Sequence, residues 1–399
     1  MDLDAQRGRW AVAAMFLANG FVMGAWAPQI PLLLPRHQIT ETTLGLLILV
    51  LGLGAVGAML FAGRLIARFG SRSVVRSFAL SVVPVLPIVV YAPSIPILAV
   101  AMAALGALIG CMDVAMNANA VEVERRLGRA IMSSSHGFWS LGGFAGGILG
   151  GQIIAAYGAE VQALWAASVS GIIVLGAMPF LLSEDHAAAL PAPGGPKPAL
   201  LPRDVALWII GGMALFSMVP EGAVLDWAAL YLSKELGADV ATSGYAFGFF
   251  AGTMAIIRFF GDSIRNRFGA VRTLQVSGVI AAIGMFGGAT AQSEWMAITS
   301  FAIAGIGVAN MVPILFSAAG NHPGLSAGAG IAAVTMVGYS GILIAPSSIG
   351  FIAEHIGFRW TYGALALLLL LVSALAGRVA AADGRQSDPQ DQGLGQAPM

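Results

Sequence analysis

The sequence predicts an all-α membrane protein with about twelve transmembrane helices in two six-helix halves. Hydrophobic residues make up 58% of the 399 residues and charged residues only 10%, whereas roughly a quarter of the residues of a soluble protein are charged. Apolar stretches of about twenty residues, the length that crosses a bilayer, recur along the whole chain. The second half of the chain also repeats features of the first. A bilayer can accommodate this much apolar surface, and a soluble fold cannot.

The expected spans are the apolar stretches of sufficient length. In the first half they cover 10–34, 43–66, 75–92, 96–119, 132–155 and 161–182, and in the second half 205–232, 242–264, 270–291, 294–318, 327–352 and 358–379. The predicted domains are therefore an N-terminal half, 1–182, and a C-terminal half, 205–382. Between them, 183–204 is rich in Pro, Ala and Gly and is expected to be a flexible cytoplasmic linker. The polar segment 383–399 is expected to be a disordered tail.

The basic residues predict the orientation of the spans. If the N-terminus is cytoplasmic, only Arg36, Lys234 and Arg359 lie on the far side, and Arg258 lies within a span. The positive-inside rule therefore predicts a protein of the inner membrane with cytoplasmic N- and C-termini and an even number of spans. The other Lys and Arg residues, all on the cytoplasmic side, are Arg7, Arg9, Arg64, Arg68, Arg72, Arg76, Arg125, Arg126, Arg129, Lys197, Arg203, Arg265, Arg267, Arg272, Arg378 and Arg385.

Short matches between the halves indicate an internal duplication. They recur with an offset of about 200 residues and in register with the expected spans. Such a duplication predicts two parallel halves related by an axis along the membrane normal. The matches pair Arg68-Phe69-Gly70 with Arg267-Phe268-Gly269, Trp139-Ser140 with Tyr339-Ser340, and Tyr157-Gly158 with Ile356-Gly357.

The loop after the second span resembles the signature loop of the major facilitator superfamily. From Gly63 to Arg72 it reads G-R-L-I-A-R-F-G-S-R, against a family pattern of G-x-L-x-D-R-x-G-R-R. The resemblance implies the twelve-helix fold of that family, transport by alternating access, and a structural or gating role for Gly63, Arg68 and Gly70. Ala67 stands where the family has an aspartate that helps to latch the cytoplasmic face. We therefore expect a weaker latch, or one built otherwise.

Three further segments resemble the group that contains the membrane proteins MosC and YbjJ and, more distantly, the fucose:proton symporters. They are 110–117 (GCMDVAMN), 135–142 (SHGFWSLG) and 221–227 (EGAVLDW). The likeness to the symporters implies that Asp113, four residues before Asn117, is a proton and sugar site. His136 occupies the place of a glutamine that contacts sugar in those proteins. Gly24 falls where they have a second essential acid.

Asp113 is the strongest candidate for proton coupling. An ionisable group deep in a span costs about 2.5–3.5 kcal/mol on insertion scales, so its presence suggests a function. Without water the carboxyl favours its neutral form, and it can load and release a proton as hydration changes. Asn117 lies one turn further along the same face. His136 is a candidate to contact solute or to exchange protons with Asp113. The alternative is that both are satisfied core residues.

The seventh span contains two further acids, Glu221 near its middle and Asp226 in its outer third. A spacing of five places them on different helix faces. Pro220 removes a backbone donor and is expected to open the helix beside Glu221, a second candidate for proton coupling. Asp226 is a candidate solute contact, with a place in a periplasmic gate as the alternative. The other predicted solute contacts are the amides and indole of Asn19, Trp26, Gln29 and Asn310.

Two patterns indicate structural roles. Arg258 and Asp262 are four residues apart on one helix face, which suits an ion pair. The fifth span contains two interleaved GxxxG series, and we expect both to form close helix contacts across the interface between the halves. The series are Gly142, Gly146 and Gly150, and Gly143, Gly147 and Gly151.

These features together predict a secondary active transporter, not an enzyme, that moves a small sugar- or polyol-like solute with protons. We find no P-loop, metal-ligand cluster or nucleophile elbow, and therefore expect no cofactor and no metal. The net charge is zero, which gives no indication of a nucleic-acid partner. The expected partners are the solute, protons and lipid, and the chain is expected to act as a monomer. Two alternatives stay open: a proton-driven exporter of drugs or metabolites, and a transport-inactive sensor.

Overall fold

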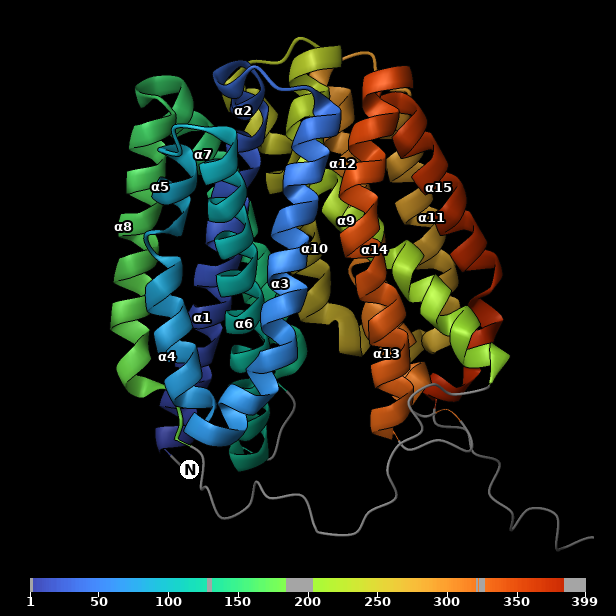
Figure 1. The fold of residues 1–399 in the computed structure, drawn as a ribbon. Helices are drawn as coiled ribbons and strands as arrows, with labels where there is room; N and C mark the ends of the chain where they lie inside the picture. Colours follow the sequence, from blue (N-terminus) through green and yellow to red (C-terminus); the bar gives the residue numbers. More distant parts are fainter. Residues whose placement is uncertain (1–2, 128–130, 184–203, 321, 323–326, 384–399) are drawn as a thin grey trace, which may run out of the picture.

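All regular structure in the described residues is helical. The computed structural model describes residues 3–127, 131–183, 204–320, 322 and 327–383 (Figure 1). The first half contains α1 (Leu3–Trp26), α2 (Ile30–His37), α3 (Glu41–Phe69), α4 (Ser71–Val82), α5 (Val85–Val90), α6 (Ile95–Leu127), α7 (Met132–Tyr157) and α8 (Ala159–Ala177). The second contains α9 (Val205–Glu235), α10 (Val240–Phe268), α11 (Ala270–Ala289), α12 (Glu294–Val308), α13 (Met311–Gly320), α14 (Ala327–Ile356) and α15 (Phe358–Ala374).

These helices form twelve crossings of the bundle, as the sequence predicts. Three crossings consist of two consecutive helices each: α1 with α2, α4 with α5, and α12 with α13. Ten of the twelve, within the described part of the chain, are long and apolar enough to cross a bilayer. The other two are α14 and the shorter apolar helix α15. The first six crossings lie on one side of the bundle in Figure 1 and the last six on the other.

Prolines explain where crossings are interrupted. Pro28 lies in a 3₁₀ turn, Ala27–Gln29, that separates α1 from α2. Pro313 cannot donate to the carbonyl of Ala309, and the helix is interrupted there, between α12 and α13. Pro220 behaves differently from our expectation, because α9 continues through it without a break. A proline inside a long packed helix can be accommodated when neighbouring groups satisfy the freed carbonyl.

The backbone supports the duplication. Gly70 and Gly269, which join the second crossing of each half to the third, have φ angles of 78° and 80°. Gly158 and Gly357, which join the fifth crossing to the sixth, have φ angles of 89° and 90°. Residues with side chains rarely adopt this region, so the glycine is needed at each tight connection. The same conformation at matching positions is what two copies of one unit would show.

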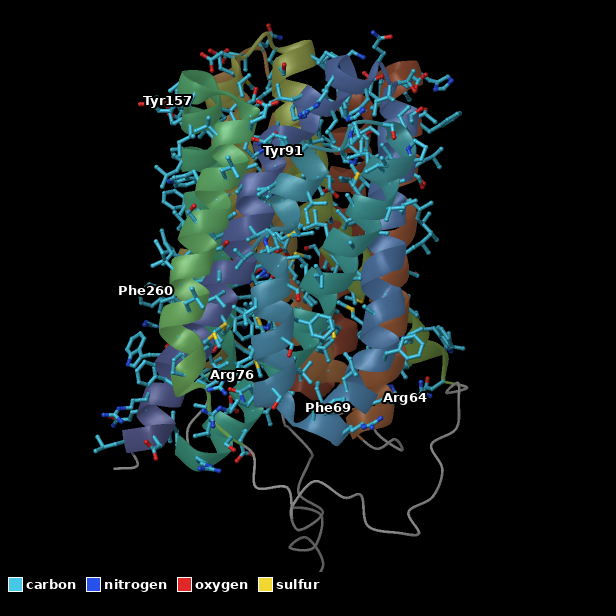
Figure 2. All side chains as sticks on the ribbon, turned by 60° about the vertical axis from the view of Figure 1, so that its left-hand side comes forward. Arg64, Phe69, Arg76, Tyr91, Tyr157 and Phe260 are labelled. Carbon is cyan, nitrogen blue, oxygen red and sulfur yellow. The ribbon has the colours of Figure 1, made fainter. Side chains whose placement is uncertain are left out.

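The two ends of the bundle differ in charge. We call the end that carries the N-terminus the basic face, because Arg64 and Arg76 lie there with Phe69 (Figure 2). Tyr91 and Tyr157 lie toward the other end, which we call the opposite face. Residues 184–203 and 384–399, which include nearly all of the predicted linker and tail, lie outside the described residues.

The interleaved glycines of α7 serve two different contacts. A Cβ at Gly142 would lie 2.2 Å from the carbonyl oxygen of Leu17, and one at Gly146 would lie 2.3 Å from that of Phe21, so this series packs against α1 in the same half. Gly147 instead meets Gly244 and Gly248 of α10. Our expectation that both series cross the interface is therefore corrected. Only the series of Gly143, Gly147 and Gly151 does so, because the two series lie on different sides of the helix.

Replacing Gly244 with Leu is expected to stop transport without preventing membrane insertion. A Cβ at this position would lie 2.6 Å from the carbonyl oxygen of Gly147, so α7 and α10 would be forced apart. Gly176→Leu is the matched control, because nothing lies within 4 Å of a Cβ there. Solute flux in proteoliposomes, normalised to the amount of inserted protein, provides the measurement. Normal flux in Gly244→Leu would mean that this contact need not be close.

Candidate solute and proton site

A connected polar unit lies between α6 and α7. The Asn117 side-chain amide donates to the Asp113 carbonyl oxygen at 2.9 Å and to its carboxyl oxygen Oδ1 at 3.3 Å. His136 Nε2 lies 3.2 Å from Asn117 Oδ1. The Phe16 ring packs edge-on against His136, with ring centroids 5.0 Å apart. The Asp113 carboxyl and the Asn117 amide, on one face of α6, are thus connected to the His136 imidazole of the neighbouring helix α7.

Arg258 of α10 connects this region to the second half. Its guanidinium donates to Ser140 Oγ of α7 at 2.8 Å and to Glu221 Oε2 of α9 at 3.4 Å. The side chains of Arg258 and Glu221 are only 12% and 23% exposed. The Arg258 charge also acts on His136. The Asp262 side chain lies outside the described residues, so its ion pair with Arg258 stays a prediction.

Asn19 of α1 supports the polar unit from the side. Its amide donates to the carbonyl oxygen of Ile109 at 3.3 Å, and its side-chain oxygen accepts from the Trp139 indole at 2.9 Å. Asn19 is buried. It therefore links α1, α6 and α7. Trp139 was part of a repeat match in the sequence, and nothing there indicated that its partner would be Asn19.

The other predicted contacts lie elsewhere. Gln29 is buried near the opposite face, where its amide donates to the Ala159 carbonyl oxygen at 2.9 Å and to Gln162 Oε1 at 2.5 Å. Asn310 lies at the interruption between α12 and α13, against Gly261 of α10. Trp26 lies beside Asp226. The predicted solute contacts therefore occupy several places along the interior and do not form one cluster.

Asp226 lines a cavity between the halves. The cavity has a volume of about 60 Å³ and is lined by α3, α9 and α14, with Ile48, Gly222, Trp227 and Pro346 among its lining residues. A second cavity of about 310 Å³ lies near the opposite face. Its wall includes three prolines, Pro28, Pro31 and Pro35, together with Lys234 and Ser243. Both cavities lie where crossings of the two halves meet.

Polar contacts join the halves at the opposite face. Lys234 of α9 forms an ion pair with Glu41 of α3. The Thr42 backbone N–H donates to Glu354 Oε2 of α14 at 2.8 Å. Close packing continues at Gly45, where a Cβ would lie 3.0 Å from the Pro346 carbonyl oxygen. The structure is thus closed between α3, α9 and α14 at this end.

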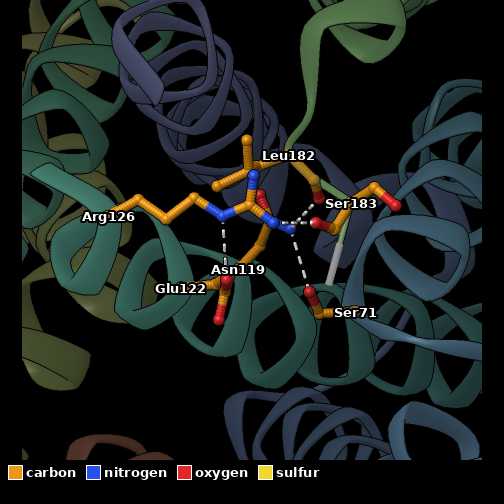
Figure 3. A network of polar contacts seen from close by, with 6 residues as sticks. All are labelled: Ser71, Asn119, Glu122, Arg126, Leu182 and Ser183. Atoms are coloured by element: carbon orange, nitrogen blue, oxygen red, sulfur yellow. Dashed lines mark hydrogen bonds and ion pairs between the residues drawn. The ribbon is translucent and has the colours of Figure 1, made fainter. Parts of the chain in front are cut away.

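A polar network at the basic face fixes the ends of the first-half helices (Figure 3). The Asn119 amide donates to Ser71 Oγ and to the Leu182 carbonyl oxygen, both at 2.9 Å. Arg126 pairs with Glu122 at 3.2 Å and donates to the Ser183 carbonyl oxygen at 2.9 Å. None of these contacts was predicted from the sequence. The i,i+4 spacing of Glu122 and Arg126 was the available signal.

Twelve crossings in two pseudo-symmetric halves, with buried polar groups meeting between the halves, define a multi-pass membrane transporter. The model of the Major Facilitator Superfamily matches residues 12–346 and 227–396. The chain belongs to this family, and it is accordingly a transporter and not an enzyme.

Relatives along nearly the whole chain belong to the same family or are described as transporters or membrane proteins. An uncharacterized MFS-type transporter of Yersinia pestis is 35% identical over 366 residues, covering 91% of this chain and 93% of the relative. The membrane protein MosC of Rhizobium meliloti is 31% identical over 361 residues, covering 87% and 84%. The resemblance to the MosC group that the sequence motifs indicated is therefore confirmed.

Solved structures with the same fold are much more distant in sequence. A variant of the nucleoside transporter NupG has a TM-score of 0.73 at 12% identity, covering 93% of this chain and 99% of that one. A D-xylose-proton symporter has a TM-score of 0.71 at 15% identity, covering 94% and 98%. At these identities the likeness shows the fold alone.

Proposed function

We propose that the chain moves a small sugar- or polyol-like solute across the inner membrane by alternating access, coupled to protons. The observation that carries the proposal is the connected unit of Asp113, Asn117 and His136, with Arg258 between it and Glu221. Ionisable side chains inside a membrane bundle are costly and are found mainly on ion and solute pathways. A D-xylose-proton symporter has the same fold, so the fold is compatible with the proposed solute and coupling ion.

In this proposal Asp113 is the proton carrier and Asn117 and His136 are solute contacts. A solute hydroxyl would replace the bond between His136 and Asn117, whose 3.2 Å length leaves both groups able to take another partner. Glu221 and Arg258 of the second half face the region of Asp113, Asn117 and His136. Proton binding at Asp113 and closure of the two halves can therefore influence each other. The halves, 1–182 and 205–382, are the proposed moving bodies.

The proposed orientation places the basic face in the cytoplasm. Its arginines then lie on the side that the positive-inside rule favours, and both termini are cytoplasmic. The ion pair of Glu41 with Lys234 then closes the periplasmic side. Alternating access requires this closure to open when solute enters from the periplasm.

Proton movement in reconstituted vesicles tests the proposal. Proteoliposomes that contain a trapped pH-sensitive dye are challenged with a panel of sugars and polyols, and empty liposomes serve as the control. We expect at least one member to drive proton entry that depends on the protein. If lipophilic drugs alone drive proton movement, the chain is an exporter. If the panel members bind without any flux, it is a sensor.

Lys234→Ala is expected to shift the protein toward an outward-open state. The substitution removes the positive partner of Glu41, whose side chain is only 6% exposed although that of Lys234 is 54% exposed, so the loss is on the order of 1 kcal/mol or more. Even 1 kcal/mol changes a two-state population about fivefold. Labelling of a cysteine introduced at Ser243, in the neighbouring cavity, measures the shift. The control is Arg36→Ala, which breaks an exposed ion pair with Glu160 inside one half. Equal labelling in both variants would contradict the role of Lys234.

A further inference from the structure

The buried acids of the bundle interior differ in how they are balanced. Glu221 has Arg258 as its partner, and the Asp113 carboxyl accepts a hydrogen bond from Asn117. Asp226 is 91% buried, and no Lys, Arg or His of the described chain forms an ion pair with it. A buried carboxylate without a positive partner is strongly unfavourable. Asp226 therefore needs a proton or a cation from outside the chain.

The groups around Asp226 do not provide that cation. Trp26 of α1 lies beside it. Tyr362 of α15 is close enough to Asp226 for the two groups to interact electrostatically. Its hydroxyl donates to the Ala223 carbonyl oxygen at 3.3 Å and carries no positive charge. From α3 and α14 the cavity is lined by the apolar residues Ile48 and Ile349. Among the described side chains, those that face Asp226 are thus aromatic and apolar, and none of them carries a positive charge.

The cavity beside Asp226 suits a small positively charged group. Its volume of about 60 Å³ is about twice the roughly 30 Å³ that one water molecule occupies in the liquid. The Trp227 indole also lines the cavity. Its buried Nε1–H has no hydrogen-bond partner in the described structure and is a donor for a solute oxygen, so it is the ring face that would meet the positive group. Indole faces attract cations, most strongly where water is excluded. A neutral hydroxyl would leave the carboxylate uncompensated, whereas an ammonium group would neutralise it.

We propose that Asp226 binds a positively charged amine on the transported solute, so that the solute is an amine-bearing sugar or polyol. The proposal rests on the function proposed above and assigns proton coupling and solute recognition to two different acids. Asp113 carries the proton in the first half, and Asp226 recognises the amine in the second. Because the two acids lie on different halves, a solute held by both sites would connect the bodies that move.

Binding of matched probe pairs tests this assignment. The purified full-length protein is titrated with glucosamine against glucose, and with 1-amino-1-deoxysorbitol against sorbitol, and its melting temperature is followed. A ligand raises the melting temperature of the state that it binds. We expect the amine of each pair to bind at least about tenfold more tightly than its neutral counterpart, because the neutral compound leaves the buried carboxylate without a positive partner.

Three variants separate recognition from folding and from proton coupling. Asp226→Asn should weaken amine binding about tenfold or more, and Asp226→Glu should retain most of it. Asp113→Asn should retain amine binding. A melting transition without ligand shows whether each variant is folded. If Asp226→Asn does not fold, the amine and neutral probes are compared on a folded Asp226→Glu.

Several outcomes would overturn the proposal. These are equal binding of amine and neutral probes, unchanged amine binding in Asp226→Asn, and no response to any of the four compounds. If sorbitol or glucose drives proton entry and the amines do not, the amine assignment is wrong and proton-coupled polyol transport stands. If the amines bind through Asp226 but never move protons, the amine assignment stands and the proposed coupling is wrong.

Discussion

Asp113→Asn is expected to abolish proton-driven accumulation of solute while exchange of solute across the membrane continues. The amide cannot take up and release a proton, but it keeps the size of the carboxyl and can still form a hydrogen bond with Asn117, whose amide now donates to Asp113 at 3.3 Å. Solute binding at Asn117 and His136 is therefore preserved. Accumulation under an imposed proton gradient and counterflow without a gradient, in the same proteoliposomes, measure the two activities separately.

An acid outside the interior provides the control for this prediction. Glu160 is about half exposed and pairs with Arg36 at the opposite face, so Glu160→Gln should leave both activities at the wild-type level. Normal accumulation in Asp113→Asn would mean that another group carries the proton. Loss of counterflow together with accumulation would mean that Asp113 acts in solute binding or folding and not in coupling alone.

Most of the fold could be predicted from the sequence because it depends on local composition. Each crossing is an apolar run long enough to span a bilayer, and the glycines at 70 and 269 mark the same tight connection in both halves. Pro28 and Pro313 lie where crossings are interrupted. Pro220 does not interrupt α9, and the difference depends on what surrounds the freed carbonyl, which composition does not specify.

The candidate site could be predicted only where its contacts lie within one helix, because contacts between helices depend on packing. Asp113 and Asn117 are four residues apart on one helix, so their hydrogen bond follows from helix geometry alone. The contacts of Arg258 with Ser140 and Glu221 join three helices, and sequence spacing does not indicate them. The pair of Arg258 with Asp262, which the spacing does indicate, stays a prediction. Gln29 was expected among solute contacts, and its bonds to Ala159 and Gln162 depend on how α8 packs.

Arg258→Met is expected to impair folding and to eliminate transport. It leaves Glu221, whose side chain is 23% exposed, without its positive partner. Removing one member of a fully buried ion pair costs about 3–5 kcal/mol, and the partial exposure of this pair lowers the cost. The melting temperature of the purified variant should therefore fall, and initial rates of solute uptake should reach background.

The double variant Arg258→Met with Glu221→Gln distinguishes the two effects. With the uncompensated acid removed, an apolar side chain beside a neutral amide should restore most of the lost stability, as replacement of buried ion pairs often does. Transport should not return, because the bond from Arg258 to Ser140 at 2.8 Å joins the second half to the helix bearing His136 one turn away from that histidine. Restored stability with restored transport would show that the pair is only a packing element. Restored stability without transport would place Arg258 in the coupling between the halves.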